Sequence, residues 1–148
     1  MEAREITDIS ELLKIVPIEI GIMKKEPKHG SMSLRDKITW LEAGMNNKSI
    51  HSHYEFKIYF MEKDGELVGF VILSVLKSVI KYFDEIRVYR VWQKDPEVAD
   101  CFWKVVKELG EKYKIKKIKF EVNRPAMERL CRKKYNMRSV SINMEGKI

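Results

Sequence analysis

The chain has 148 residues, the size of one ordinary domain, and 45% of them are apolar. This supplies one hydrophobic core and excludes a disordered chain, and no apolar run approaches the roughly 18 residues of a membrane-spanning helix. Two cysteines, Cys101 and Cys131, are typical of free thiols in a reducing compartment, so we expect a cytoplasmic protein with no membrane partner. The net charge of +7 favours an anionic partner, a nucleotide cofactor or a nucleic acid, although solvated surface faces account for the same excess.

Two helices are predicted in the N-terminal third. The first runs from Ile6 to about Lys24, with Asp8 or Ser10 as its cap and a kink or end at Pro17. The second begins at the capping residue Ser33, and a loop over 24–33 joins the two.

Three strands follow, over Glu55–Glu62, Leu67–Leu76 and Tyr82–Trp92. The first two are joined by Asp64-Gly65, a strong hairpin turn. The second is a nearly continuous apolar run, which is typical of a strand buried on both faces. His51 and His53, which are separated by one residue, have no third ligand nearby, so no metal site is expected.

The second half alternates helices and strands. Asp95 is a capping residue and Pro96 suits a first helical position, which predicts a helix over 95–113. A strand over 115–122, a helix from 125 and a strand over 137–144 follow. We therefore predict one α/β domain over 1–148, with a mixed sheet and right-handed crossovers that bring some strands parallel.

Three segments resemble one known family. The hairpin Glu62–Phe70 contains the D-G-x-x-V-G turn, 102–122 aligns without a gap to a helix and a strand, and 123–137 is similar to an N-x-x-A … L-Y-x-K-x-G-F ending. In order and spacing they resemble the GCN5-related N-acetyltransferase (GNAT) family, from about Ser33 onward, with the first strand missing or hidden near Glu5. The resemblance implies a mixed sheet whose fourth and fifth strands run parallel and splay apart at Trp92, flanked by helices.

The same resemblance implies a cofactor, acetyl-CoA or another acyl-CoA, in the gap between those strands. Its pyrophosphate would meet the N-terminus of the following helix, where the family has Q/R-x-x-G-x-G/A. This chain has Lys94 for the basic residue, Ala99 for the last small one and Glu97 for the central glycine. The implied cofactor-binding residues are Val91 and Trp92 through their amides, then Lys94, Glu97, Val98, Ala99 and Asn123. Asn123 either bonds the pantetheine arm or only caps the last helix.

The departure from the family pattern works against phosphate binding. Glu97 places a Cβ and a negative charge where the pyrophosphate would approach, and Pro96 removes an N–H donor. Asp95 is expected to occupy a helix amide itself. Each like charge costs on the order of 1 kcal/mol in a wet site, which Lys94 and Arg90 offset in part.

The catalytic residues implied by the family are an acid on the fourth strand and a proton donor in the last helix. Asp84 and Glu85 lie near the place of the family's general base, and a solvated strand end is the alternative for both. Cys131 stands where the family has its Tyr. A thiol with a pKa of about 8.5 is able to protonate a leaving thiolate, and the alternative is a buried small side chain.

Two functions remain open at this stage. One is an N-acyltransferase whose acceptor, an amine on a small molecule or a protein, is selected by the N-terminal helices and the 24–33 loop. The other is a non-catalytic relative that binds a protein or a nucleic acid through basic side chains and exposed aromatic residues. The altered loop and the missing Tyr also resemble phage or mobile-element members of the family.

Overall fold

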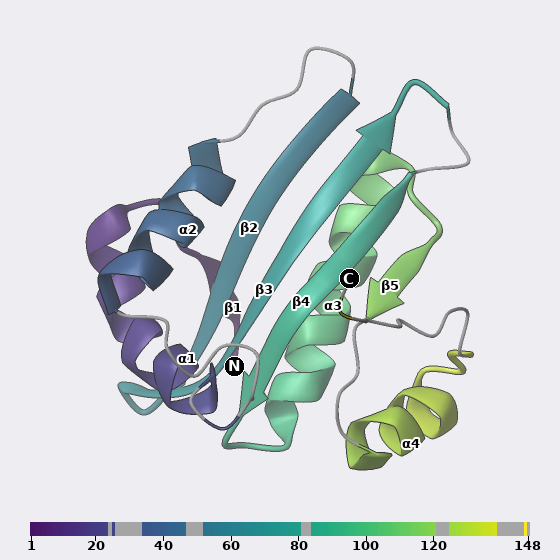
Figure 1. Ribbon diagram of the computed structural model, residues 1–148. Coiled ribbons are helices and arrows are strands. Elements are labelled where there is room, and N and C mark those ends of the chain that lie inside the picture. Colours follow the sequence, from purple (N-terminus) through teal and green to yellow (C-terminus); the bar gives the residue numbers. More distant parts are fainter. Residues whose placement is uncertain are drawn as a thin grey trace.

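The computed structural model describes residues 1–23, 25, 34–46, 52–80, 84–120, 125–138 and 147 (Figure 1). The strands in these residues are β1 (Ala3–Glu5), β2 (Ser52–Lys63), β3 (Glu66–Ser78), β4 (Glu85–Gln93) and β5 (Ile118–Phe120). The helices are η1 (Ile9–Lys14, a 3-10 helix), α1 (Val16–Met23), α2 (Leu34–Asn46), α3 (Glu97–Tyr113) and α4 (Pro125–Lys134).

The strands form one mixed sheet in the order β1-β2-β3-β4-β5. The pairs β1–β2, β2–β3 and β3–β4 are antiparallel, and β4–β5 is parallel. The mixed α/β fold and the parallel pairing predicted from the sequence are confirmed. The α1 and α2 helices lie on one face of the sheet, and α3 crosses the other face from β4 to β5 (Figure 1).

The N-terminus differs from the single helix expected over 6–24. The first strand is present as β1, a three-residue edge strand too short to show as a pattern. Asp8 then caps η1, because its carboxylate accepts a hydrogen bond from the Ser10 N–H at 3.0 Å. Pro17 is the second residue of α1 and does not break it, because the first-turn N–H groups of a helix need no intrahelical partner.

The strand expected over 115–122 begins later than predicted. Lys114 adopts a left-handed backbone at φ 56° and ends α3, and β5 begins at Ile118, while 121–122 lie outside the described residues. Met137 and Arg138 are not in a strand, and 139–144, the rest of the last expected strand, lies outside the described residues.

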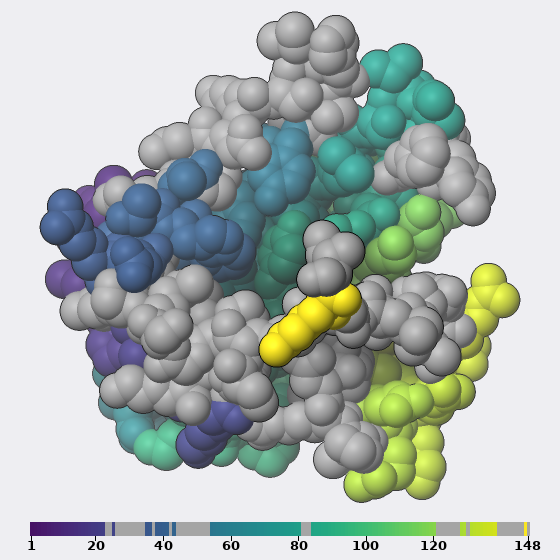
Figure 2. Space-filling model, in the orientation of Figure 1, coloured from purple at the N-terminus to yellow at the C-terminus, as the bar shows by residue number. Residues whose placement is uncertain are grey.

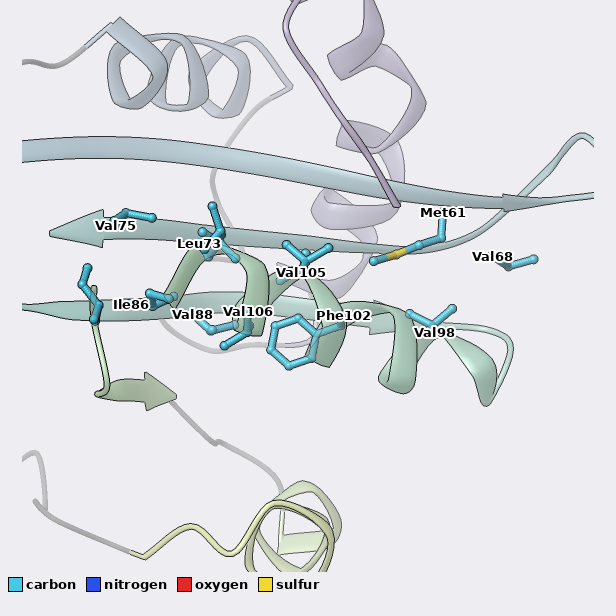
Figure 3. Close-up of a cluster of buried hydrophobic side chains, with 13 residues drawn as sticks. Met61, Val68, Leu73, Val75, Ile86, Val88, Val98, Phe102, Val105 and Val106 are labelled. Carbon is cyan, nitrogen blue, oxygen red and sulfur yellow. The ribbon is translucent and has the colours of Figure 1, made fainter. Parts of the chain in front are cut away.

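Two hydrophobic cores lie on opposite faces of the sheet, and β3 contributes to both. Val71, Leu73 and Val75 pack under α3, while Phe70 and Ile72 pack under α1 and α2. All five side chains are at most 1% exposed. The prediction that this strand is buried on both faces is therefore confirmed, and Figure 3 shows the core under α3.

Gly69 is the residue of β3 on which the first turn of α3 rests. A Cβ at Gly69 would lie 2.4 and 2.6 Å from the two γ-methyl carbons of Val98, which is fully buried. A side chain at this position would push the helix away from the sheet. Glycine therefore sets how closely α3 approaches β3.

Replacing Gly69 by Ala is expected to lower the free energy of unfolding by about 1–3 kcal/mol, the usual cost of overpacking a core. Urea unfolding followed by circular dichroism measures the change. The matched control is Gly21→Ala at an exposed position of α1, where no heavy atom lies within 4 Å of the added Cβ. The control should be neutral or slightly stabilising. Equal stability of Gly69→Ala and the wild type would contradict the packing argument.

Candidate functional site

The β4 strand continues beyond its pairing with β5. The described pairs are Ile86–Ile118, Arg87–Lys119 and Val88–Phe120. From Tyr89 to Gln93, β4 has no partner on its β5 side among the residues that the structure describes. This half of the strand remains hydrogen-bonded to β3 on its other side.

A β-bulge lies where the two halves of β4 meet. Ile72 of β3 pairs with Arg90, but the next β3 residue, Leu73, pairs with Val88. Tyr89 is therefore the extra residue. A bulge re-aims the side chains around it, and here both Tyr89 and Arg90 reach toward the α1 and α2 face.

The bulge also changes which backbone groups face β5. Before it, the Ile86 N–H donates at 2.9 Å to the carbonyl just before β5. After it, the Lys94 N–H donates to the Val68 carbonyl of β3 at 2.8 Å. Because hydrogen bonding alternates along an antiparallel pair, Val91 and Gln93 direct their backbone groups away from β3. By the same alternation the amide of Trp92 faces β3.

The first backbone N–H groups of α3 are hydrogen-bonded by Asp95, the residue just before the helix, as predicted. The Asp95 carboxylate accepts a hydrogen bond from the Glu97 N–H at 2.9 Å. The Asp95 carbonyl accepts another from the Val98 N–H at 3.1 Å. The side chains of Val98 and Ala99 are buried in the fold rather than turned to solvent.

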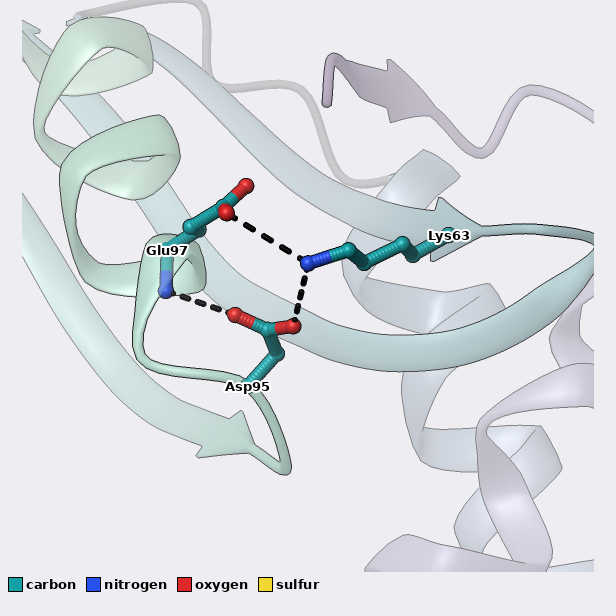
Figure 4. A network of polar contacts seen from close by, with 3 residues as sticks. All are labelled: Lys63, Asp95 and Glu97. Carbon is teal, nitrogen blue, oxygen red and sulfur yellow. Dashed lines mark hydrogen bonds and ion pairs between the residues drawn. The ribbon is translucent and has the colours of Figure 1, made fainter.

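Lys63, at the end of β2, joins this helix terminus (Figure 4). Its ammonium lies 3.0 Å from the Asp95 carboxylate and 3.3 Å from that of Glu97. Lys94 instead pairs with Glu66 across the β3–β4 pair. No sequence pattern indicates Lys63, because it lies 32 residues before Asp95 and contacts it only in the folded chain.

Glu19 of α1 is a second residue, after Lys63, that the family resemblance did not indicate. Its side chain is 2% exposed, and its carboxylate pairs with the Arg90 guanidinium at 3.0 Å. The sequence contains one indication, since Glu19 is the only acid in the apolar helix VPIEIGIM. A buried acid in such a helix requires a charged or hydrogen-bonding partner.

A cavity of about 990 Å³ lies between the C-terminal half of α3 and β5, lined among others by Ile86, Gly110 and Lys114. Trp103 of α3 and the candidate acid Asp84 also line the cavity, but Val91, Lys94 and Glu97 do not. No described helix is long and apolar enough to cross a membrane. The described residues also contain no group of three His, Cys, Asp or Glu placed to hold a metal.

No protein-family model and no curated protein matches this chain. Solved structures do match it. An aminoglycoside acetyltransferase from an uncultured soil metagenomic sample, in complex with sisomicin, has a TM-score of 0.71 and 10% identity, covering 99% of this chain and 95% of that one. AAC(6')-Iy, in complex with the bisubstrate analogue CoA-S-monomethyl-acetylneamine, has a TM-score of 0.62 and 10% identity, with coverages of 99% and 97%. A ribosomal-protein-alanine N-acetyltransferase from Brucella melitensis biovar Abortus 2308 has a TM-score of 0.62 and 12% identity, with coverages of 99% and 96%.

The chain has the GNAT fold. The resemblance inferred from the sequence is thus confirmed at the level of the fold. Within this fold, the structure brings Val91, Lys94 and Glu97 together where β4 ends and α3 begins.

The candidate acids lie at the other end of β4 in this GNAT fold. Glu85 is about 23 Å along the strand from Trp92, at roughly 3.3 Å per residue. Its carboxylate pairs with Arg87 at 3.2 Å. The buried Asp84 carboxylate accepts a hydrogen bond from the Ser78 N–H at 2.7 Å and pairs with Lys77 at 2.8 Å. Asp84 thereby stabilises the connection between β3 and β4.

Cys131 lies on α4, and α4 docks beside the first turns of α3. The Tyr135 hydroxyl donates to the Ala99 carbonyl at 3.3 Å, and the Tyr135 ring stacks on Trp103 at 4.5 Å. Cys131 is 6% exposed, and burial raises the pKa of its thiol. It therefore stays protonated at neutral pH. Asn123, together with the side chain of His53 and all of His51, lies outside the described residues.

The charge of Asp95 is expected to stabilise α3 in a pH-dependent way. The hydrogen bond from Glu97 N–H, and then the Lys63 ammonium, hold the pKa of Asp95 below its ordinary value. A lowered pKa in the folded state means that the stabilisation is complete above about pH 4, the unfolded value, and is lost as the pH falls further.

Thermal unfolding of Asp95→Asn and Asp95→Ala between pH 3 and pH 7 measures this contribution. Asn keeps the capping oxygen and loses the charge, so its deficit in Tm relative to the wild type should be present at neutral pH and vanish on the acid side. The Ala variant loses both the capping oxygen and the charge, so it should remain less stable than the wild type at every pH. A deficit for Asn that is independent of pH would refute the assignment to charge.

Proposed function

We propose that the protein is an acyl-CoA-dependent N-acyltransferase that transfers an acetyl group to an amine by direct attack on the thioester. The observation that carries the proposal is the β4 edge from Tyr89 to Gln93, which has no partner on its β5 side among the described residues. There Val91 and Gln93 direct their amides away from β3 beside the start of α3. It is supported by the likeness to acetyltransferase structures, one with a CoA-containing bisubstrate analogue and one with sisomicin. Acyl-CoA supplies an activated acetyl group at this edge.

The two ends of the proposed site are not equally suited to acyl-CoA. The thioester arm fits the β4 edge, where the Val91 N–H is placed to polarise a carbonyl oxygen. The diphosphate end fits poorly, because Asp95 already accepts from the first amide of α3 and Glu97 adds a second carboxylate. Lys63 and Lys94 are the cations close enough to this terminus to hold a diphosphate, once they exchange their present carboxylate partners for it.

Cys131 is the proposed proton donor, and solvent water is the proposed first acceptor of the amine proton. The new bond joins the amine nitrogen to the carbonyl carbon, and the carbon–sulfur bond breaks. The amine proton passes to solvent water, because Glu85 lies about 20 Å along β4 from Val91 and cannot accept it directly or through one water. The leaving thiolate takes its proton from the Cys131 thiol, which burial keeps protonated. Asp84 positions the start of β4 rather than reacting.

Isothermal titration with CoA tests the proposal. The wild type should bind, and Glu97→Gln should bind roughly two- to fivefold more tightly, since it removes an exposed like charge at the diphosphate end. The matched control is Glu108→Gln, which removes the same charge from an exposed position about 16 Å further along α3. The control should bind as the wild type does. Absence of heat from all three folded proteins would contradict the proposal.

The closed α3 terminus specifically favours a second function, a GNAT-fold protein without catalysis that binds a protein or nucleic acid. Asp95, Glu97 and Lys63 already satisfy one another, so the fold is stable there without an anion. Failure to bind CoA would leave this second function. Binding of a nucleic acid would then weaken steeply with added salt, as expected for contacts to phosphates.

A further inference from the structure

An aromatic corner lies on the α1 and α2 face of the sheet. Phe56 of β2 and Tyr89 of β4 lean toward each other across the small Ser74 of β3, with ring centroids 6.0 Å apart and planes at 28°. The Tyr89 and Ser74 hydroxyls are hydrogen-bonded at 3.0 Å. Tyr89 reaches this position because it is the extra residue of the bulge.

Trp40 of α2 forms the outer wall of the corner. Its ring stands edge-on to Phe56 at 5.5 Å and to Tyr89 at 6.4 Å, with interplanar angles of 87° and 86°. Trp40 is 42% exposed, whereas Phe56 is 8% exposed. The corner is thus closed toward the sheet and open toward solvent. Figure 2 shows this face of the molecule, where the surface between α2 and β4 is recessed.

The polar groups of the corner are neutral. Burial, and then the hydrogen bond with Tyr89, raises the pKa of Tyr54 to about 12. The Tyr54 hydroxyl therefore offers a hydrogen bond without charge at neutral pH, and the Ser74 hydroxyl is neutral by its chemistry.

The charges around the corner are already matched. Arg87 pairs with Glu85 at 3.2 Å, and Arg90 pairs with Glu19 at 3.0 Å. Each of these two guanidinium groups of β4 thus has a carboxylate partner, Glu85 on β4 and Glu19 on α1. These two ion pairs contribute no net negative charge that would attract a compound with several ammonium groups, whereas a flat apolar group would gain contact with the exposed ring of Trp40 beside Tyr89.

We infer that this corner is the acceptor site and that the acceptor is a monoamine carried on a flat aromatic group, not a polycation. The inference rests on the proposed acyltransferase function and names its substrate class. The ring of the acceptor would pack against Trp40, and its single ammonium would lie against the aromatic faces and the neutral hydroxyls. The free amine then lies on the face of β4 that carries the bulge.

Isothermal titration without any CoA tests this inference, with 2-phenylethylamine and sisomicin as the two probes. We expect 2-phenylethylamine to bind at least tenfold more tightly than sisomicin. Trp40→Ala should weaken 2-phenylethylamine binding at least fivefold, and Trp40→Phe should restore most of it. Leu13→Ala, which truncates another exposed apolar residue, is the matched control and should bind as the wild type does. Melting temperatures establish that each variant is folded.

Tighter binding of sisomicin, or unchanged binding in Trp40→Ala, would overturn the inference. The outcome is separable from the proposed function, because no CoA is present. A protein that binds CoA but not 2-phenylethylamine contradicts only the aromatic corner. A protein that binds 2-phenylethylamine through Trp40 but never binds CoA supports the corner as a binding site and contradicts acyl transfer.

Discussion

The contact between Val98 and Gly69 fixes the position of the site. The γ-methyl carbons of Val98 occupy the space that a side chain at position 69 would fill, so α3 lies directly on β3 at the end of β4. The first turn of α3 is held there by a buried side chain rather than by surface interactions. As a result, the α3 N-terminus and the part of β4 around Val91 and Gln93 share one end of the sheet.

The charges at this end would limit how the proposed acyl-CoA binds. Helix N-termini attract anions, but Asp95 already supplies one and Glu97 supplies a second. Lys63 neutralises one of the two charges, so the three residues together carry a net charge of −1 (+1 from Lys63 and −2 from the two acids). A GNAT fold with such a terminus must hold a diphosphate mainly by lysine side chains, which is weaker and more sensitive to salt than binding to helix amides.

The sequence predicted the features that depend on local pattern. The apolar run over 67–76 indicated a strand buried on both faces, and the capping role of Asp95 followed from its place before Pro96. Features that depend on tertiary contact were missed. Lys63 meets Asp95 only after the sheet has formed, and a one-residue bulge at Tyr89 leaves no trace in the apolar pattern of its strand. The same limit applies to Glu85, whose distance from the α3 terminus follows only from the strand's length and direction.

Backbone hydrogen exchange, measured residue by residue by NMR with and without acetyl-CoA, tests the central claim most directly. The amides of Val91 and Gln93 face away from β3, whereas those of Trp92 and Lys94 face it. Acetyl-CoA should therefore slow exchange at Val91 and Gln93 by at least tenfold more than at Trp92 and Lys94. Unchanged relative exchange at Val91 and Gln93 at millimolar acetyl-CoA would contradict the assignment of this edge as the acyl-CoA site.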